Sequence, residues 1–207
     1  MKRRTRNASL VLILALAALP ASAAGAGGLL LGQVEPAWNP SWMPAVPDSA
    51  RDLEYLGGFG YGVDADGMIT GGFGLAFLDY ESFDPASWDS AGAAPRHLAG
   101  GVGGMVLGSR FFGGREAHLD LAARLGVGGV GISDRTGSAG AWSYVSTGYA
   151  IAYAEPYLEL GLGLAPWLQL SATLGYHIMG NFLPGKAFSD FVYYAPTIGL
   201  TFGFGSF

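Results

Sequence analysis

Residues 153–177 read YAEPYLELGLGLAPWLQLSATLGYH, and apolar side chains recur there at every second position on both sides of Ala165-Pro166. The other parity holds mainly glycine, hydroxyl, amide and charged side chains. A period of two is typical of β-strands, whose successive side chains point to opposite faces. The stretch therefore predicts two strands joined by a tight turn. Its apolar parity consists of Leu158, Leu160, Leu162, Leu164, Leu168, Leu170, Ala172, Leu174 and Tyr176.

Further segments alternate in the same way, and the connections between them differ in length. Short turns lie near residues 64, 113 and 165, whereas longer polar segments occupy 36–52, 81–95, 133–149 and 181–190. Short turns on one side and long loops on the other are typical of bacterial outer-membrane barrels. The alternation is consistent only if 29–34 is also a strand, which gives an even count of eight, as closed single-chain barrels usually have. The other strands outside 153–177 are expected at 53–63, 68–80, 97–112, 118–127 and 192–204.

The composition favours strands over spanning helices. Of the 207 residues, 50% are hydrophobic and 13% are charged, against about 25% charged in soluble domains. Beyond the N-terminal segment, no run approaches the ~20 apolar residues of a transmembrane helix. The chain has no Cys, which excludes disulfides, a thiolate metal site and a lipidated cysteine.

The first residues predict a signal peptide over 1–23, followed by a barrel domain over 24–207. A basic start with Lys2, Arg3, Arg4 and Arg6 precedes the apolar run 10–19 and the small residues before Ala24. Those four are among 11 Lys and Arg residues, so their removal leaves seven basic against 16 acidic residues. Such an acidic chain is a poor candidate for binding nucleic acid.

The hairpin at 163–170 (GLAPWLQL) and the closing strand at 199–204 (GLTFGF) resemble those of small outer-membrane proteins of the OmpA/OmpX type. The resemblance implies an all-β, closed up-and-down antiparallel transmembrane barrel of eight strands. It places a monomer in the lipid of the bacterial outer membrane. It also implies that Phe202, Phe204 and Phe207 form the signal read by the barrel-assembly machinery. Phe207 has the opposite parity to the other two, so either Gly205-Ser206 forms a bulge or Phe207 lies outside the ladder.

If the polar parity faces the lumen, it collects a set of ionisable side chains, joined by Arg110 if its glycine-rich strand points the same way. Eight strands enclose a space that side chains fill. An unpaired charge there would be destabilising by several kcal/mol. We therefore interpret the set as a structural network of ion pairs, with a narrow polar pore as the alternative. Its expected members are Glu54, Asp120, Arg124, Glu155, Glu159 and His177.

No residue pattern points to catalysis, a metal or a cofactor. The three histidines, His97, His118 and His177, are scattered and show no ligand spacing. His177 and Ser171 do not form a His-x-Ser arrangement, so a lipid-modifying enzyme is the least favoured alternative. The glycine-rich stretches 57–60 and 100–104 lack the Lys of a phosphate loop, and small residues in a tight lumen explain them better.

Aromatic residues near the strand ends are interpreted as the interfacial girdles of a barrel. They are Tyr80, Tyr144, Tyr149, Trp167, Tyr176, Tyr193 and Tyr194.

The sequence thus predicts a non-enzymatic outer-membrane barrel with a structural or surface-interaction role exerted through its outer loops. The main alternative is a soluble, secreted, lipocalin-like binding protein, in which the apolar parities would face inward. The direction of the leucines distinguishes the two. In a transmembrane barrel Leu121, Leu160 and Leu170 face lipid, whereas in a soluble barrel they converge on a dry interior.

Overall fold

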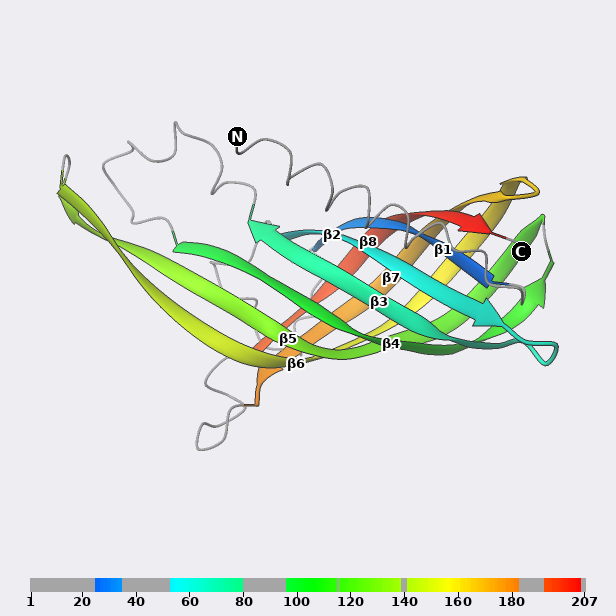
Figure 1. The fold of residues 1–207 in the computed structure, drawn as a ribbon, viewed down its shortest axis with the longest axis horizontal. Helices are drawn as coiled ribbons and strands as arrows, with labels where there is room; N and C mark the ends of the chain where they lie inside the picture. The colour runs from blue at the N-terminus through cyan, green and yellow to red at the C-terminus, as the bar shows by residue number, and fades with distance from the viewer. Residues whose placement is uncertain are drawn as a thin grey trace, which may run out of the picture.

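The computed structural model describes residues 25–34, 53–79, 96–114, 116–138, 141–182 and 192–205. Each strand pairs antiparallel with the next, and β8 pairs with β1, which closes the barrel (Figure 1). The predicted all-β, up-and-down barrel of eight strands is confirmed. The strands are β1 (Gly25–Val34), β2 (Leu53–Val63), β3 (Met68–Asp79), β4 (Arg96–Gly113), β5 (Ala117–Ser138), β6 (Ala141–Ala165), β7 (Leu168–Asn181) and β8 (Val192–Gly205).

Several predicted features lie outside the described residues. These are the signal peptide 1–23, Tyr80, the segments 36–52 and 81–95, and Phe207. The predicted first strand at 29–34 is present as part of β1, which begins earlier, at Gly25. Within the described residues, no helix has the length and apolar character needed to cross a bilayer.

The leucine faces point outward. Leu121 is 45% exposed and Leu160 is 50% exposed, and Leu170, on the same exterior, is partly covered by its neighbours. Among strand residues whose side chains are described, Glu54 is the one charged side chain on this exterior. An apolar exterior of this extent suits hydrocarbon tails and not water. The fold is therefore a transmembrane barrel, and the lipocalin-like alternative is wrong.

Large aromatic side chains gather where β4, the β6–β7 turn and β8 reach the short-turn end of the barrel. Phe111, Phe112 and Trp167 are 62%, 60% and 59% exposed. Trp167 stacks on Phe204 with ring centroids 6.4 Å apart. Exposed aromatic rings at strand ends form the interfacial girdle of membrane barrels. Trp167 was predicted for this girdle and the two phenylalanines were not, whereas Tyr149, also predicted for it, packs against the core of the lumen.

The lumen has an apolar half and a polar half. Strands β1 to β4 contribute mainly apolar side chains, and strands β5 to β8 contribute most of the buried polar ones. The apolar half therefore packs like a protein core, and buried polar chemistry is concentrated in the other half. The buried apolar side chains of the apolar half include Leu30, Leu53, Tyr55, Tyr61, Ile69, Phe73, Leu75, Phe77, Val102 and Val106.

Glu54 does not lie in the lumen, which corrects the sequence prediction. In β2 the large side chains Tyr55 and Tyr61 are buried inside, so the alternate residue Glu54 points outward and is exposed. The Tyr55 hydroxyl donates to the Ile198 carbonyl and the Tyr61 hydroxyl donates to Glu159 Oε1, so both phenols have polar partners inside. A strand with aromatics on one face and glycine on the other does not reveal which face is inside.

Glycines occupy both faces of β2 and β4. Gly57 and Gly104 face inward, where a Cβ atom would overlap the carbonyl oxygens of Gly74 and Leu125. Gly58 and Gly103 face outward, where the nearest atom to a Cβ would lie 3.4 and 3.5 Å away. The explanation of a tight lumen thus applies to alternate glycines only.

The turn between β2 and β3 follows the prediction. Asp64 Oδ1 accepts the backbone N–H of Asp66 at 3.0 Å and of Met68 at 2.8 Å. Gly67 has φ of 82°, a conformation that favours glycine. The Asp64 carboxylate and Gly67 together fix this short turn.

Strands β5 and β6 extend through the segment 133–149 that the sequence analysis expected to be a loop. Their pairing continues from the barrel to Ser138↔Ala141 without a register shift. Trp142, Tyr144 and Val145 are strong strand formers, which accounts for the extension. Figure 1 shows this hairpin projecting beyond the ends of the other strands.

Candidate functional site

The polar half of the lumen is the candidate site. Five of the six predicted members are at most 2% exposed and lie on β5, β6 and β7, and Glu54 is separate from them on the exterior. The β5–β6 register places Asp120 opposite Glu159 and Arg124 opposite Glu155. Facing residues in an antiparallel pair have neighbouring side chains. The buried members are Asp120, Arg124, Glu155, Glu159 and His177.

Glu155 is the centre of the first group of polar contacts. Arg124 Nη1 lies 2.5 Å from Glu155 Oε2, which also accepts the Tyr153 hydroxyl at 2.9 Å. Glu155 Oε1 accepts the Thr197 hydroxyl at 3.1 Å. The Arg124 guanidinium lies 4.0 Å from the centroid of the Tyr157 ring. The buried charges of Arg124 and Glu155 therefore compensate each other.

His177 lies against this group among aromatic rings. Its ring centroid is 4.9 Å from that of Tyr55, 5.2 Å from that of Tyr153 and 5.8 Å from that of Phe77. His177 Nε2 is 3.1 Å from Glu155 Oε1, but the two atoms do not have the geometry of a hydrogen bond. The imidazole therefore packs as a ring in contact with a carboxylate.

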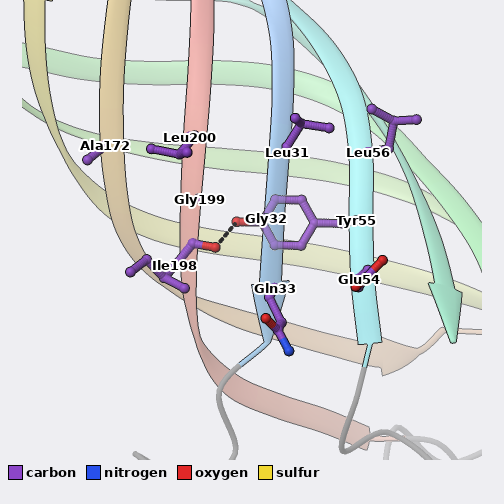
Figure 2. A pocket seen from close by; sticks show the side chains of 10 residues that line it. All are labelled: Leu31, Gly32, Gln33, Glu54, Tyr55, Leu56, Ala172, Ile198, Gly199 and Leu200. Atoms are coloured by element: carbon purple, nitrogen blue, oxygen red, sulfur yellow. Dashed lines mark hydrogen bonds between the residues drawn. The ribbon is translucent and has the colours of Figure 1, made fainter. Parts of the chain in front are cut away.

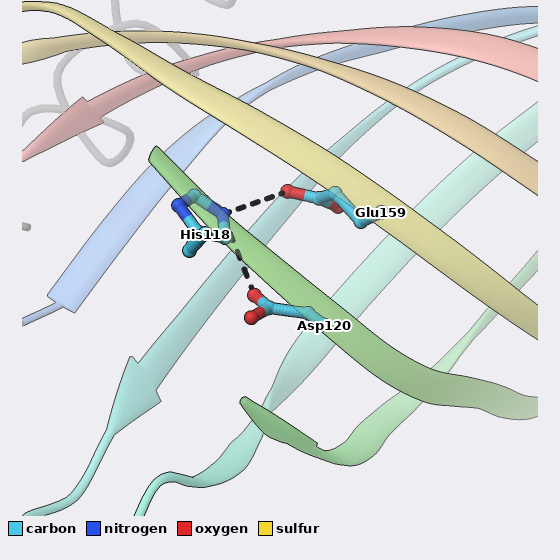
Figure 3. Close-up of side chains that lie close together, drawn as sticks. All are labelled: His118, Asp120 and Glu159. Carbon is cyan, nitrogen blue, oxygen red and sulfur yellow. Dashed lines mark ion pairs between the residues drawn. The ribbon is translucent and has the colours of Figure 1, made fainter. Parts of the chain in front are cut away.

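A second group lies nearer the short-turn end, around Asp120. Arg110 donates to both oxygens of Asp120, at 2.8 and 2.9 Å. His118 Nε2 lies 3.5 Å from Asp120 Oδ2 and 3.9 Å from Glu159 Oε1 (Figure 3). Glu159 Oε1 also accepts the Tyr61 hydroxyl at 3.4 Å. Arg110 thus belongs to the network, and His118 is a member that the sequence analysis did not include.

Local irregularities position this second group. The β4–β5 register shifts between Arg110 and Phe112, and Arg110 pairs with Asp120. Gly161 lies opposite His118 in the register, and a Cβ atom there would overlap the imidazole ring. The bulge and the glycine therefore set the approach of Arg110 and leave room for His118.

An apolar hollow of about 730 Å³ lies on the exterior over β7, β8, β1 and β2 (Figure 2). Leu31, Leu56 and Leu200 in its lining are 43%, 48% and 48% exposed. Gln33 and Glu54 are the lining residues with polar side-chain ends exposed on this surface. Because the exposed leucines belong to the lipid-facing exterior, the hollow is part of that surface.

The groups considered for lipid chemistry do not reach this exterior. His177 is fully buried and Ser171 is 1% exposed, and Ser171 Oγ accepts the amide of Gln169 at 2.7 Å inside the barrel. An enzyme acting on membrane lipid needs its catalytic groups where the lipid is. The arrangement of these two residues is that of lumen packing.

No protein-family model and no curated protein matches the chain. Among solved structures, that of Ail, the attachment invasion locus protein of Yersinia pestis, is similar to the structure of this chain. The two chains are 11% identical, the match covers 87% of this chain and 96% of that chain, and the TM-score is 0.38. The fold is established by the strand pairing and the apolar exterior described above. The chain is a small, eight-stranded transmembrane barrel.

Proposed function

We propose that the protein is a non-enzymatic protein of the bacterial outer membrane that presents the projecting β5–β6 hairpin to partners at the cell surface. Long hairpins of such barrels lie on the outer side, and short turns lie on the periplasmic side. The partner we propose is an extended polypeptide segment that adds a strand to the hairpin. Export through the predicted signal peptide 1–23 is part of this proposal.

The observation that carries the proposal is the edge of β6. β7 pairs with β6 from Ile151 onward, so within the described residues 141–148 have a strand partner on the β5 side alone. Natural proteins usually protect such an edge with Pro, or with Lys and other charged residues. The segment AWSYVSTG contains none of them. A long strand edge without protection is suited to β-strand addition.

The direction of each backbone group identifies the residues that would bind. The Ala150 carbonyl accepts the Phe182 N–H at 3.1 Å, so Ala150 directs its backbone groups away from β5. Successive residues of a strand alternate in this respect. The N–H groups of Ser146 and Tyr144 therefore point to the open edge, and that of Val145 points to β5.

The plugged lumen supports a role other than conduction. Arg124 and Glu155, on the neighbouring strands β5 and β6, are paired inside the lumen. Tyr153, Tyr157 and His177 pack around them. Eight strands leave little space beyond such side chains. These contacts favour the structural network over the narrow pore.

The test uses intact cells and the absence of cysteine from the chain. Ser143→Cys is expected to react with a membrane-impermeant maleimide in whole cells, whereas Gly114→Cys at the short-turn end reacts only after the outer membrane is opened. A photoreactive residue at Tyr144 should then give adducts with extracellular or surface proteins. Ser146→Pro removes an edge donor and should abolish them, while heat-modifiable migration of the barrel is kept.

Val145→Pro is the contrasting variant, because it removes a donor from the β5–β6 ladder and should disrupt the hairpin itself. Two results would refute the proposal. One is labelling of Ser143→Cys only after the membrane is opened. The other is an adduct yield from Tyr144 that Ser146→Pro leaves unchanged.

A further inference from the structure

Three side chains with metal-binding atoms converge near the short-turn end of the lumen. His118, Asp120 and Glu159 each offer one ligand atom, and these atoms all lie within 4.8 Å of one another. The residues are 1%, 1% and 2% exposed. Figure 3 shows the His118 ring directed at both carboxylates, with His118 and Asp120 on β5 and Glu159 on β6. The surface role proposed above does not involve this cluster.

The atoms that converge are acceptors. The Gln169 amide nitrogen lies 3.0 Å from His118 Nε2. In this arrangement the amide donates, so Nε2 carries a lone pair and the imidazole proton is on Nδ1. Without a proton, Nε2 also lies 3.5 Å from Asp120 Oδ2 and 3.9 Å from Glu159 Oε1 and donates to neither. Acceptors that face one another repel unless a cation or a proton lies between them.

The charges of the lumen leave one carboxylate without an arginine. Asp120 is paired with Arg110, and Glu155 is paired with Arg124. Among the described ion pairs, Glu159 has His118 alone, at 3.9 Å. Its hydrogen bond from the Tyr61 hydroxyl is long, at 3.4 Å. Burial of such a carboxylate is unfavourable unless it is paired, so the cluster favours an additional positive charge.

We propose that His118, Asp120 and Glu159 bind a divalent transition-metal cation of the Zn²⁺ type. One imidazole nitrogen and two carboxylate oxygens form a donor set that Zn²⁺ accepts. Donors at ~2.1 Å from a tetrahedral ion are separated by roughly 3.4 Å. The His118–Asp120 separation of 3.5 Å already fits this spacing, and Glu159 at 3.9 Å is within a small side-chain movement.

Neighbouring residues would hold and complete the site. Tyr61 orients Glu159, and Arg110 orients Asp120, as outer-shell partners of metal ligands do. If the Gln169 amide turns over, its carbonyl oxygen takes the place of its nitrogen beside His118 and becomes available as a fourth ligand. The positive charge of Arg110 opposes the ion, so we expect moderate affinity and a titration that extends to high Zn²⁺ concentration.

The experiment uses the untagged, full-length barrel in detergent micelles, with Zn²⁺ titrated calorimetrically and Co²⁺ used as a spectroscopic probe. We expect one Zn²⁺ per barrel, visible absorption from Co²⁺ in a low-symmetry site, and a Zn²⁺-dependent rise in the unfolding temperature. His118→Gln and Glu159→Gln should each weaken Zn²⁺ binding about tenfold or more, by analogy with the 10–100-fold losses on changing outer-shell partners. Both cluster variants are made because one of them could fail to fold. Heat-modifiable migration on a gel shows whether each barrel is folded.

His177→Gln is the matched control, because His177 is also buried in the lumen but lies outside the cluster. It should leave the Zn²⁺ affinity unchanged. Binding that persists in both cluster variants, or that is lost in His97→Gln, would overturn the proposal. A folded barrel that takes up a proton but no Zn²⁺ would also overturn it.

Discussion

At the scale of single residues, the direction of each side chain decides what the barrel tolerates. Glycines alternate between positions where a Cβ atom would overlap the backbone and positions that open onto lipid. Gly103 and Gly104 are adjacent and differ in this respect. They therefore form an internal comparison within one strand.

Gly104→Ala is expected to lower the free energy of unfolding by about 1–3 kcal/mol, because the new methyl group would overlap the Leu125 carbonyl. Gly103→Ala should change it little, since the nearest atom would lie 3.5 Å away. Urea unfolding of both variants in the same micelles or vesicles measures the difference. Equal effects of the two substitutions would show that the glycine faces are not as described.

At the scale of strands, the β5–β6 pair holds the lumen network together. Arg124 on β5 and Glu155 on β6 face each other in the register and are nearly fully buried. Arg124→Met would leave the Glu155 carboxylate without its cation, which should cost about 3–5 kcal/mol of stability. The double variant Arg124→Met with Glu155→Gln should recover much of this loss. A double-mutant cycle in urea measures the coupling, and an additive result would contradict the pairing.

The same strands show what the sequence could and could not predict. In β5 to β7 the apolar parity is leucine-rich and the other is largely polar, so the pattern predicted both strand and orientation, and five lumen residues followed from it. In β2 the aromatics face inward, and Glu54 was therefore misplaced. The side of an aromatic–glycine strand depends on what fills the barrel, which one strand does not reveal.

Two further features depended on the register between strands. The extension of β5 and β6 was expected to be a loop because its residues are small and polar, although Trp142, Tyr144 and Val145 favour strand. Recognition of that hairpin would have placed Asp120 opposite Glu159, since the pairing runs from Ser138↔Ala141 to Ala117↔Leu162 without a shift. The cluster with His118 was missed for this reason, because Glu159 is distant in sequence from His118 and Asp120.

At the scale of the whole molecule, one arrangement underlies all of these features. The leucine faces contact hydrocarbon, the lumen is filled by a core on one side and by paired polar groups on the other, and one hairpin projects beyond the barrel. Closure of β1 onto β8 leaves no free edge in the barrel wall. The projecting part of β6 therefore stands out as a site for strand addition.

The most direct test of this arrangement is fluorescence quenching of a probe attached to Leu160→Cys, in the otherwise cysteine-free chain reconstituted in lipid bilayers. Doxyl groups on lipid tails should quench the probe strongly, and iodide in the water should not, because residue 160 faces the hydrocarbon. Quenching by iodide, or by neither reagent, would mean that the leucine face is turned to water or to a closed interior, and would contradict the account.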